Sequence, residues 1–291
     1  MKRLSTIIII TVLVQIGSAQ TGAINYFGQI PPGNTPVVFA PGIVSLDNRF
    51  EFGAAFSKDG EEFCFSVTTS GWSSFRIYYS KHDDGYWTNP DTISFSTDRD
   101  LSPVFSSDGQ SLMFSRQTDI YRVNRYESNW SNPIKVPAPI SSNFDEWTVR
   151  ISDNGSLYFS STRTGGEDIF RSKFMNGQYL SVENLGNIIN SDFSEDGPCI
   201  APDESYLIFT SRKPGGYGNR DLYISFQKDD NTWTSPINLG PIINKNCFNF
   251  SPYLSPDGKY LFFSRRYHWD SMDIYWVNTH FIEGLREKTK Q

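Results

Sequence analysis

The chain has 291 residues, with 26 lysines and arginines against 32 aspartates and glutamates, and a formal net charge of −6. An acidic chain with no basic run before its tail is not expected to bind nucleic acid or an anionic lipid surface. Its three cysteines, Cys64, Cys199 and Cys247, form an odd set without metal-ligand spacing, so they do not indicate a disulfide framework.

Residues 1–19 have the pattern of a secretory signal peptide. They begin with Met-Lys-Arg, continue with a mostly apolar stretch over residues 7–16, and end in the small residues Gly-Ser-Ala. The apolar stretch is shorter than the roughly 20 residues that a transmembrane helix needs. We therefore expect export to the periplasm or out of the cell, with no membrane insertion after cleavage.

Five copies of one pattern follow, each with an apolar stretch, a Ser-Asp-Gly-like turn, and aromatic residues that end in Ser or Thr. The copies occupy residues 52–66, 101–115, 147–161, 197–211 and 251–264. The turn aspartates, spaced 45 to 54 residues apart, are Asp59, Asp108, Asp153, Asp203 and Asp257. A repeat of this length, built of short strands, is typical of the blades of a β-propeller.

The second copy shows the expected strands of one blade. Residues 101–105 predict a first strand and residues 111–115 a second, joined by an Asp-Gly turn that suits a tight hairpin. Residues 119–123 predict a third strand, and a fourth begins at Trp130. The other copies have the same order, except that the last copy has no fourth strand after Val277.

The strand missing at the end is expected at the front of the chain. Residues 36–43 mirror residues 236–243 at an offset of 200. The N-terminal segment is therefore expected to complete the last blade, which closes the ring and covers an exposed sheet edge. The sequence predicts an all-β chain with a single five-bladed propeller of four-stranded antiparallel blades over residues 20–279, followed by a charged tail over residues 280–291.

The repeat resembles a known family of propellers. The last copy reads Ser251-Pro252-Tyr253-Leu254-Ser255-Pro256-Asp257-Gly258 and is followed by Asp273-Ile274-Tyr275. This pattern resembles the TolB-type, WD-repeat-like β-propellers of bacterial envelopes, and the similarity covers about residues 36–277. The resemblance implies an exported module for contact with other proteins, often in the periplasm. It implies no catalytic set, because the repeated residues are scaffold.

Four copies carry an arginine after the second strand and an aspartate at the start of the third, and the first copy lacks both. The pairs are Arg116 and Asp119, Arg163 and Asp168, Arg212 and Asp221, and Arg265 and Asp273. Their joint presence predicts a structural Arg–Asp bond across each hairpin.

A candidate binding face follows from counting back eight residues from each turn aspartate, to the start of the innermost strand. The residues reached are Glu51, Asp100, Asp145, Glu195 and Asn249, and the acids Glu146 and Asp196 are adjacent to two of them. Aromatic residues expected on the same face are Trp72, Trp147, Tyr217 and Trp269. Carboxylates framed by aromatic rings can bind a cation, a basic peptide or a sugar. The alternative is that the acids cap strand ends in solvent and the aromatic rings are ordinary packing.

These patterns favour a non-enzymatic binding or scaffold propeller that engages a protein or peptide of the cell envelope. The rival is a glycan-binding or glycoside-hydrolysing five-bladed propeller that uses Glu51, Asp100 and Glu195. Hydrolysis needs two carboxylates about 5–10 Å apart, and the regular repeat around these residues lacks the insertions that usually mark an active site. We predict no cofactor. Calcium at the ring of acids is compatible with this interpretation, but the spacing around the acids does not match an EF-hand loop.

Overall fold

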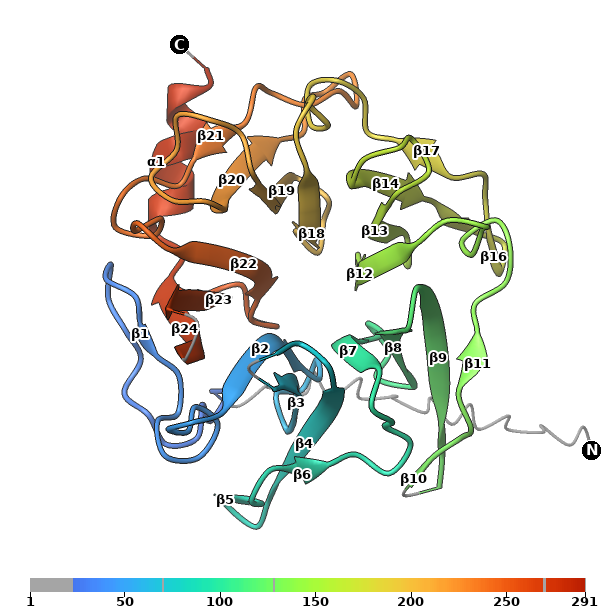
Figure 1. The fold of residues 1–291 in the computed structure, drawn as a ribbon, viewed down its shortest axis with the longest axis vertical. Coiled ribbons are helices and arrows are strands. Elements are labelled where there is room, and N and C mark those ends of the chain that lie inside the picture. The colour runs from blue at the N-terminus through green and yellow to red at the C-terminus, as the bar shows by residue number, and fades with distance from the viewer. Residues whose placement is uncertain (1–22, 70, 128, 269–270, 291) are drawn as a thin grey trace, which may run out of the picture.

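The structure is a computed structural model that describes residues 23–69, 71–127, 129–268 and 271–290. The signal-peptide prediction for residues 1–19 lies outside these ranges, as does Trp269. In Figure 1 the strands stand in groups around a central axis, and the chain runs around this ring from its N-terminal to its C-terminal part. Within the described ranges, no helix is long and apolar enough to cross a membrane.

Among the described residues, antiparallel strands repeat one order, from an innermost strand near the axis to a short outer strand, and we call each such set a group. The innermost strands are β2 (Phe50–Phe56), β7 (Asp100–Phe105), β12 (Glu146–Ile151), β18 (Glu195–Ile200) and β22 (Phe248–Leu254). The second strands are β3 (Glu62–Thr68), β8 (Ser111–Arg116), β13 (Leu157–Ser161), β19 (Tyr206–Ser211) and β23 (Tyr260–His268). The third strands are β4 (Phe75–Asp83), β9 (Asp119–Tyr126), β14 (Asp168–Ser172), β20 (Asp221–Phe226) and β24 (Ser271–Asn278).

The outer strands have two residues each. They are β6 (Asp91–Thr92), β11 (Ile134–Lys135), β17 (Glu183–Asn184), β21 (Ile237–Asn238) and β1 (Val37–Val38). Further short strands extend the outer hairpins and are β5 (Tyr86–Trp87), β10 (Asn129–Trp130), β15 (Phe174–Met175) and β16 (Gln178–Tyr179). Trp130, expected to begin a fourth strand, lies in one of these hairpin extensions, because the outer strand β11 starts four residues later.

The front of the chain supplies the outer strand of the group that contains β22, β23 and β24. Val37 of β1 lies opposite Trp276 of β24 in an antiparallel pair. Ile237 lies 200 residues later, in β21, and pairs in the same way with Ile224 of β20. The segment before β1 strengthens this junction, because the Tyr26 hydroxyl donates a hydrogen bond to the Asp257 carboxylate at 3.1 Å.

Short side-chain bonds hold the turns between the first and second strands. The Ser106 hydroxyl donates to the Asp108 carboxylate at 2.6 Å, and the same carboxylate accepts the backbone N–H of Gln110 at 2.9 Å. In the third copy Asn154, the residue after Asp153, makes these contacts, because it stands two residues after Ser152 as Asp108 stands two residues after Ser106. Counting back eight residues from Asn154 gives Glu146 rather than Asp145.

A serine at or next to the end of four copies of the repeat ties neighbouring groups together. Its side chain is buried, and its hydroxyl oxygen accepts a hydrogen bond from a backbone N–H of the innermost strand of the next group. These bonds join Ser66 to Ser102, Ser115 to Thr148, Ser160 to Gly197, and Ser264 to Gly53. The last bond, at 3.2 Å, joins the C-terminal part of the ring to the N-terminal part.

Replacing Ser264 by alanine is expected to lower the free energy of unfolding by about 1–3 kcal/mol, because the buried N–H of Gly53 loses its acceptor. Urea unfolding measures the change. The matched control is Ser181→Ala, because Ser181 is exposed and its loss is expected to change stability by less than about 0.5 kcal/mol. Equal stabilities of the two variants would contradict the role of this bond between groups.

The end of the chain packs on the ring. Residues 280–291 were predicted to be a charged tail. Within this segment the structure has a helix, α1 (Phe281–Lys288). Ile282 is buried, and the Arg286 guanidinium lies 4.9 Å from the ring centre of Phe226. The aliphatic and charged faces of the helix therefore separate, with the apolar side against β20.

Candidate functional site: the entrance pocket

The predicted acids at the starts of the innermost strands are buried and do not face the axis. Glu51, Asp100 and Glu146 are fully buried, and Glu195 is 1% exposed. The two oxygens of Asp100 accept hydrogen bonds from Arg116 at 2.7 and 2.8 Å, and one of them also accepts the backbone N–H of Thr97 at 2.6 Å. These carboxylates are therefore engaged inside their own groups.

The same arrangement recurs around the ring. Glu146 binds Arg163, Glu51 binds Arg49, and Asn249 binds Arg265, while Glu195 accepts bonds from two serine hydroxyls. The arginines also donate to backbone carbonyls of the incoming loop, as Arg116 does to Phe95 at 3.1 Å. The buried acids therefore fasten each connecting loop to the top of its innermost strand.

The predicted Arg–Asp bonds across the second hairpin are wrong for three of the four pairs, because Arg265, like the arginines of the first two pairs, binds a residue of the first strand. Arg116 and Arg163 bind Asp100 and Glu146 of the first strand, and Asp119 instead pairs with Lys135 at 2.7 Å. Arg116 lies opposite both Asp100 and Asp119 in the strand register. Water cannot solvate a buried carboxylate, so the ion pair with arginine stabilises the buried Asp100 more than it would stabilise the partly exposed Asp119.

The residue after each buried acid lies at the axis instead. Successive side chains of a strand point to opposite sides, so the inward ring lies one residue beyond the predicted one. Its members are Phe52, Leu101, Trp147, Asp196 and Phe250, and all five line one cavity of about 150 Å³. Together with Trp72, Glu167 and Arg220 they form what we call the entrance pocket.

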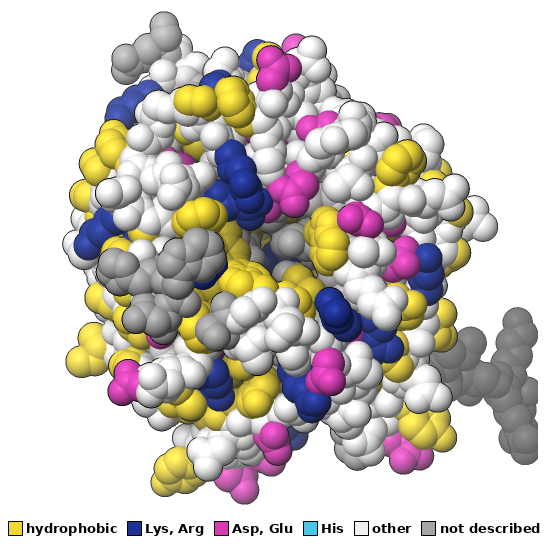
Figure 2. All heavy atoms as spheres, in the orientation of Figure 1, with side chains coloured by type: hydrophobic (Ala, Val, Ile, Leu, Met, Phe, Trp, Pro, Cys, Tyr) yellow, Lys and Arg dark blue, Asp and Glu magenta, His cyan; other side chains and the backbone are white. Residues whose placement is uncertain are grey.

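The structure thus brings together three of the predicted site residues, Trp72, Trp147 and Asp196, in the entrance pocket. Tyr217 is exposed and is not part of its lining, and its backbone N–H bonds to Asp221. Asp145 is half-buried next to the pocket residues in sequence but is also outside the lining. Figure 2 shows a hollow at the centre of the ring, with hydrophobic, basic and acidic side chains around it.

A charged cluster occupies one wall of the entrance pocket. The Arg220 guanidinium lies 2.6 Å from an Asp196 oxygen and 3.2 Å from a Glu167 oxygen, which joins two neighbouring groups of strands. Burial raises the pKa of the Asp196 carboxyl, and Arg220 opposes that shift. The Nε atom of Arg220 is buried and has no hydrogen-bond partner.

Sequence reasoning missed Glu167 and Arg220, although a local signal existed. Each directly precedes an aspartate that opens a third strand. The corresponding residues in two other copies, Thr118 and Met272, are uncharged. The charges of Glu167 and Arg220 therefore do not recur around the ring, and a comparison of repeated positions does not reveal them.

Arginines also border the pocket on the side of Trp72. A neighbouring cavity of about 200 Å³ is lined by Trp72, Arg212, Arg220, Phe248, Phe250 and Arg266. The Arg266 guanidinium lies 5.5 Å from the Trp72 ring centre. Arg212, Arg220 and Arg266 outnumber the two acids of the cluster, Glu167 and Asp196. The region is therefore basic, whereas the sequence predicted an acidic ring. In the part of the chain that the structure covers, no group of three or more His, Cys, Asp or Glu side chains could hold a metal ion.

Comparisons with known proteins support the fold. No protein-family model matches the sequence, and no curated protein matches it. Among solved structures, TolB from Acinetobacter baumannii is similar with a TM-score of 0.51 and 16% identity, over 78% of this chain. The chain spans 54% of the length of that TolB.

Two further solved structures give the same result. A putative TolB from Agrobacterium tumefaciens has a TM-score of 0.53 and 17% identity, over 79% of this chain and 78% of the other. An α-L-arabinofuranosidase from Podospora anserina, in complex with cellotriose, has a TM-score of 0.56 and 11% identity, over 85% of this chain and 97% of the other. At these identities the similarity concerns the fold alone, and the chain has a TolB-like β-propeller fold.

Proposed function

We propose that the chain is an exported five-bladed propeller, closed by its N-terminal strand, that binds a protein or peptide partner in the cell envelope without catalysing a reaction. The pairing of β1 with β24 and the five repeated groups support the architecture. The signal-peptide pattern of residues 1–19 and the TolB-like fold support an envelope location.

The observation that carries the proposal is the convergence of four aromatic side chains on the entrance pocket. Trp72, Trp147, Phe52 and Phe250 all line it, and both tryptophans are only partly buried. Tryptophan and arginine are enriched at the residues that dominate protein interfaces. Because Arg220 is held between two acids, little of its freedom is lost when a partner binds.

The surrounding charges specify the partner further. Arg212 and Arg266 line the adjoining cavity beside Trp72, so an acidic group has basic side chains to meet there. An aromatic or aliphatic side chain fits between the rings of the entrance pocket. We therefore propose a partner segment that carries an apolar side chain close to an acidic one, in place of the basic peptide that an acidic ring would favour.

A glycan is the second candidate, because aromatic rings stack on sugars and because α-L-arabinofuranosidases share this fold. The carboxylates named for hydrolysis argue against catalysis. Glu51, Asp100 and Glu195 are at most 1% exposed and are bound to Arg49, Arg116 and serine side chains. A general acid or nucleophile must reach the glycosidic bond, and these three groups lie behind the pocket wall.

A peptide-binding experiment tests the proposal. Nine-residue peptides selected against residues 20–291 are expected to combine aromatic and acidic residues, and Trp147→Ala is expected to weaken their binding about 30-fold, as for an interface residue worth about 2 kcal/mol. The control is Tyr86→Ala, because Tyr86 is 79% exposed on an outer hairpin. Fluorescence anisotropy measures both affinities.

Two outcomes would contradict the proposal. Peptide binding that is equally strong in the Trp147→Ala and wild-type proteins would place the binding surface elsewhere. Binding of arabino-oligosaccharides that depends on Trp147, together with release of nitrophenol from a nitrophenyl arabinofuranoside, would identify a glycosidase instead.

A further inference from the structure

Arg150 is a buried charged residue at a position where the other copies of the repeat have uncharged side chains. In each innermost strand the register shifts after the entrance-pocket residue, and pairing resumes three residues later. Such a bulge re-aims the side chains that follow it. The residues at which pairing resumes are Ala55, Val104, Arg150, Cys199 and Tyr253. Arg150 is the charged member of this layer.

The Arg150 guanidinium is buried without a carboxylate on it. Arg150 is 3% exposed. Its guanidinium donates hydrogen bonds to two backbone carbonyls, those of Val149 at 2.9 Å and Pro252 at 3.5 Å. The Nε atom has no acceptor. A guanidinium has five N–H bonds to satisfy, and a buried charge without a counter-charge is costly to the fold.

Neighbouring groups do not supply the missing negative charge. Burial raises the pKa of the Cys199 thiol to about 12, so this thiol is neutral at physiological pH. The Tyr253 hydroxyl is occupied by the backbone of Phe56, donating to its carbonyl at 3.1 Å and accepting its N–H at 2.9 Å. Asp153 is ion-paired with Lys58 at 3.5 Å, and both of these side chains are more than half exposed.

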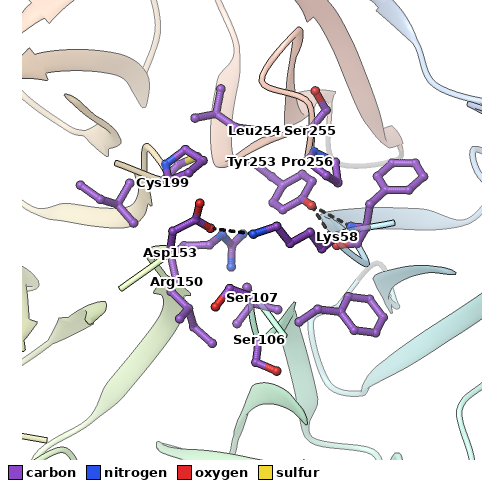
Figure 3. Close-up of a pocket in the computed structure, with 16 residues that line it drawn as sticks. Lys58, Ser106, Ser107, Arg150, Asp153, Cys199, Tyr253, Leu254, Ser255 and Pro256 are labelled. Atoms are coloured by element: carbon purple, nitrogen blue, oxygen red, sulfur yellow. Dashed lines mark hydrogen bonds and ion pairs between the residues drawn. The ribbon is translucent and has the colours of Figure 1, made fainter. Parts of the chain in front are cut away.

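Arg150 lines a cavity of about 140 Å³ at the opposite end of the innermost strands from the entrance pocket. This volume is well above the roughly 10–15 Å³ that one water needs. Figure 3 shows Arg150 in this cavity with Cys199 and Tyr253 nearby and the Lys58–Asp153 pair across it. Much of the remaining lining is apolar and includes Val104, Phe105, Ile200 and Leu254.

We propose that this cavity, the Arg150 pocket, binds a small organic carboxylate. The ligand's carboxylate lies on the Arg150 guanidinium, whose planar N–H groups match the two oxygens of a carboxylate. Its short alkyl group lies against Val104, Ile200 and Leu254. An inorganic anion has no apolar group to fill the space beside these three side chains. The site is separate from the entrance pocket and does not depend on the function proposed there.

Butyrate is the probe, with phosphate and chloride at equal ionic strength for comparison. In the unmodified protein, nuclear Overhauser effects are expected between the butyrate chain and the methyl groups of Val104, Ile200 and Leu254. At 100 times its dissociation constant, butyrate is expected to raise the ratio of folded to unfolded protein about 100-fold, and thermal unfolding measures this. Phosphate and chloride are expected to give no such rise.

Arg150→Met removes the charge and keeps much of the side-chain length. This variant is expected to lose the response to butyrate and to be at least as stable as the wild type without ligand, because an unpaired buried charge has been removed. Lys213→Met removes one positive charge from an exposed position and is expected to keep the response.

Three results would overturn the proposal. The first is an equal butyrate response in Arg150→Met and the wild type. The second is the lack of any Overhauser effect from butyrate to the three methyl-bearing residues of the unmodified protein. The third is a response to phosphate that equals or exceeds the response to butyrate, which would make the pocket a general anion site without recognition of an alkyl group.

Discussion

Replacing Glu146 by alanine is expected to lower the free energy of unfolding by about 3–5 kcal/mol, because the change leaves a largely buried guanidinium without its counter-charge. Glu146 is fully buried, and the Arg163 side chain that binds it at 3.0 Å is 16% exposed. The Ser142 hydroxyl also donates to Glu146, at 2.5 Å. The variant therefore loses the ion pair and the attachment of the incoming loop. Urea unfolding at neutral pH measures the change.

The neighbouring residue is a matched control. Asp145 precedes Glu146, is half-buried, and makes its recorded hydrogen bonds through its backbone, one of them at 3.1 Å to Thr162. Asp145→Ala is expected to change stability by less than about 0.5 kcal/mol. Losses of equal size in the two variants would contradict the assignment of Glu146, and not Asp145, to the buried ring of loop-fastening acids.

Raising the pH from about 5 to about 8 is expected to destabilise the wild type by about 2 to 3 kcal/mol more than the Glu51→Gln variant. Burial raises the pKa of Glu51 from its ordinary value of 4.5 to about 7, although Arg49 lowers it. Because the pKa in the folded protein is the higher one, the folded state holds the proton more tightly. The resulting stability is fully present below about pH 4.5 and is lost as the pH rises through about 7.

The comparison with Glu51→Gln isolates this residue. Burial also raises the pKa of Glu195 and Asp273, so both proteins are expected to lose some stability with rising pH. Glutamine keeps the size of the side chain and does not titrate. Urea unfolding over a series of pH values measures the two slopes, and parallel curves would show that the Arg49 pair keeps Glu51 ionised throughout.

The repeated turns made the strands predictable from the sequence. A Ser-x-Asp-Gly turn forms its own hydrogen bonds locally, so each copy predicts the hairpin between its first two strands without knowledge of the rest. The likeness between residues 36–43 and residues 236–243 has a structural counterpart, because β1 and β21 lie at the corresponding positions and pair in the same way.

The candidate site was predicted only in part, for reasons of geometry. A shift of one residue along a strand moves a side chain to its opposite side, so the acids counted from the turns point into the groups and their neighbours point to the axis. In the third copy the count from Asp153, in place of the turn residue Asn154, added a further shift, which exchanged Asp145 for Glu146. The order Ser152-Asp153-Asn154-Gly155 matches Ser106-Ser107-Asp108-Gly109 and marks Asn154 as the turn residue, so the second shift was readable locally. The first shift depends on how the strands pack around the axis, which no local pattern reports.

By itself the sequence determined the repeat, its turns, its short strands and the aromatic residues Trp72 and Trp147, because these depend on local hydrogen bonds and on the alternation of side chains. Only the tertiary structure decided which charges are buried and which meet at the axis. Glu167 and Arg220 come from different groups, and Arg150 faces inward only because a bulge precedes it. Such contacts join segments about 50 residues apart in the repeat, so they exist only once the groups are packed around one axis.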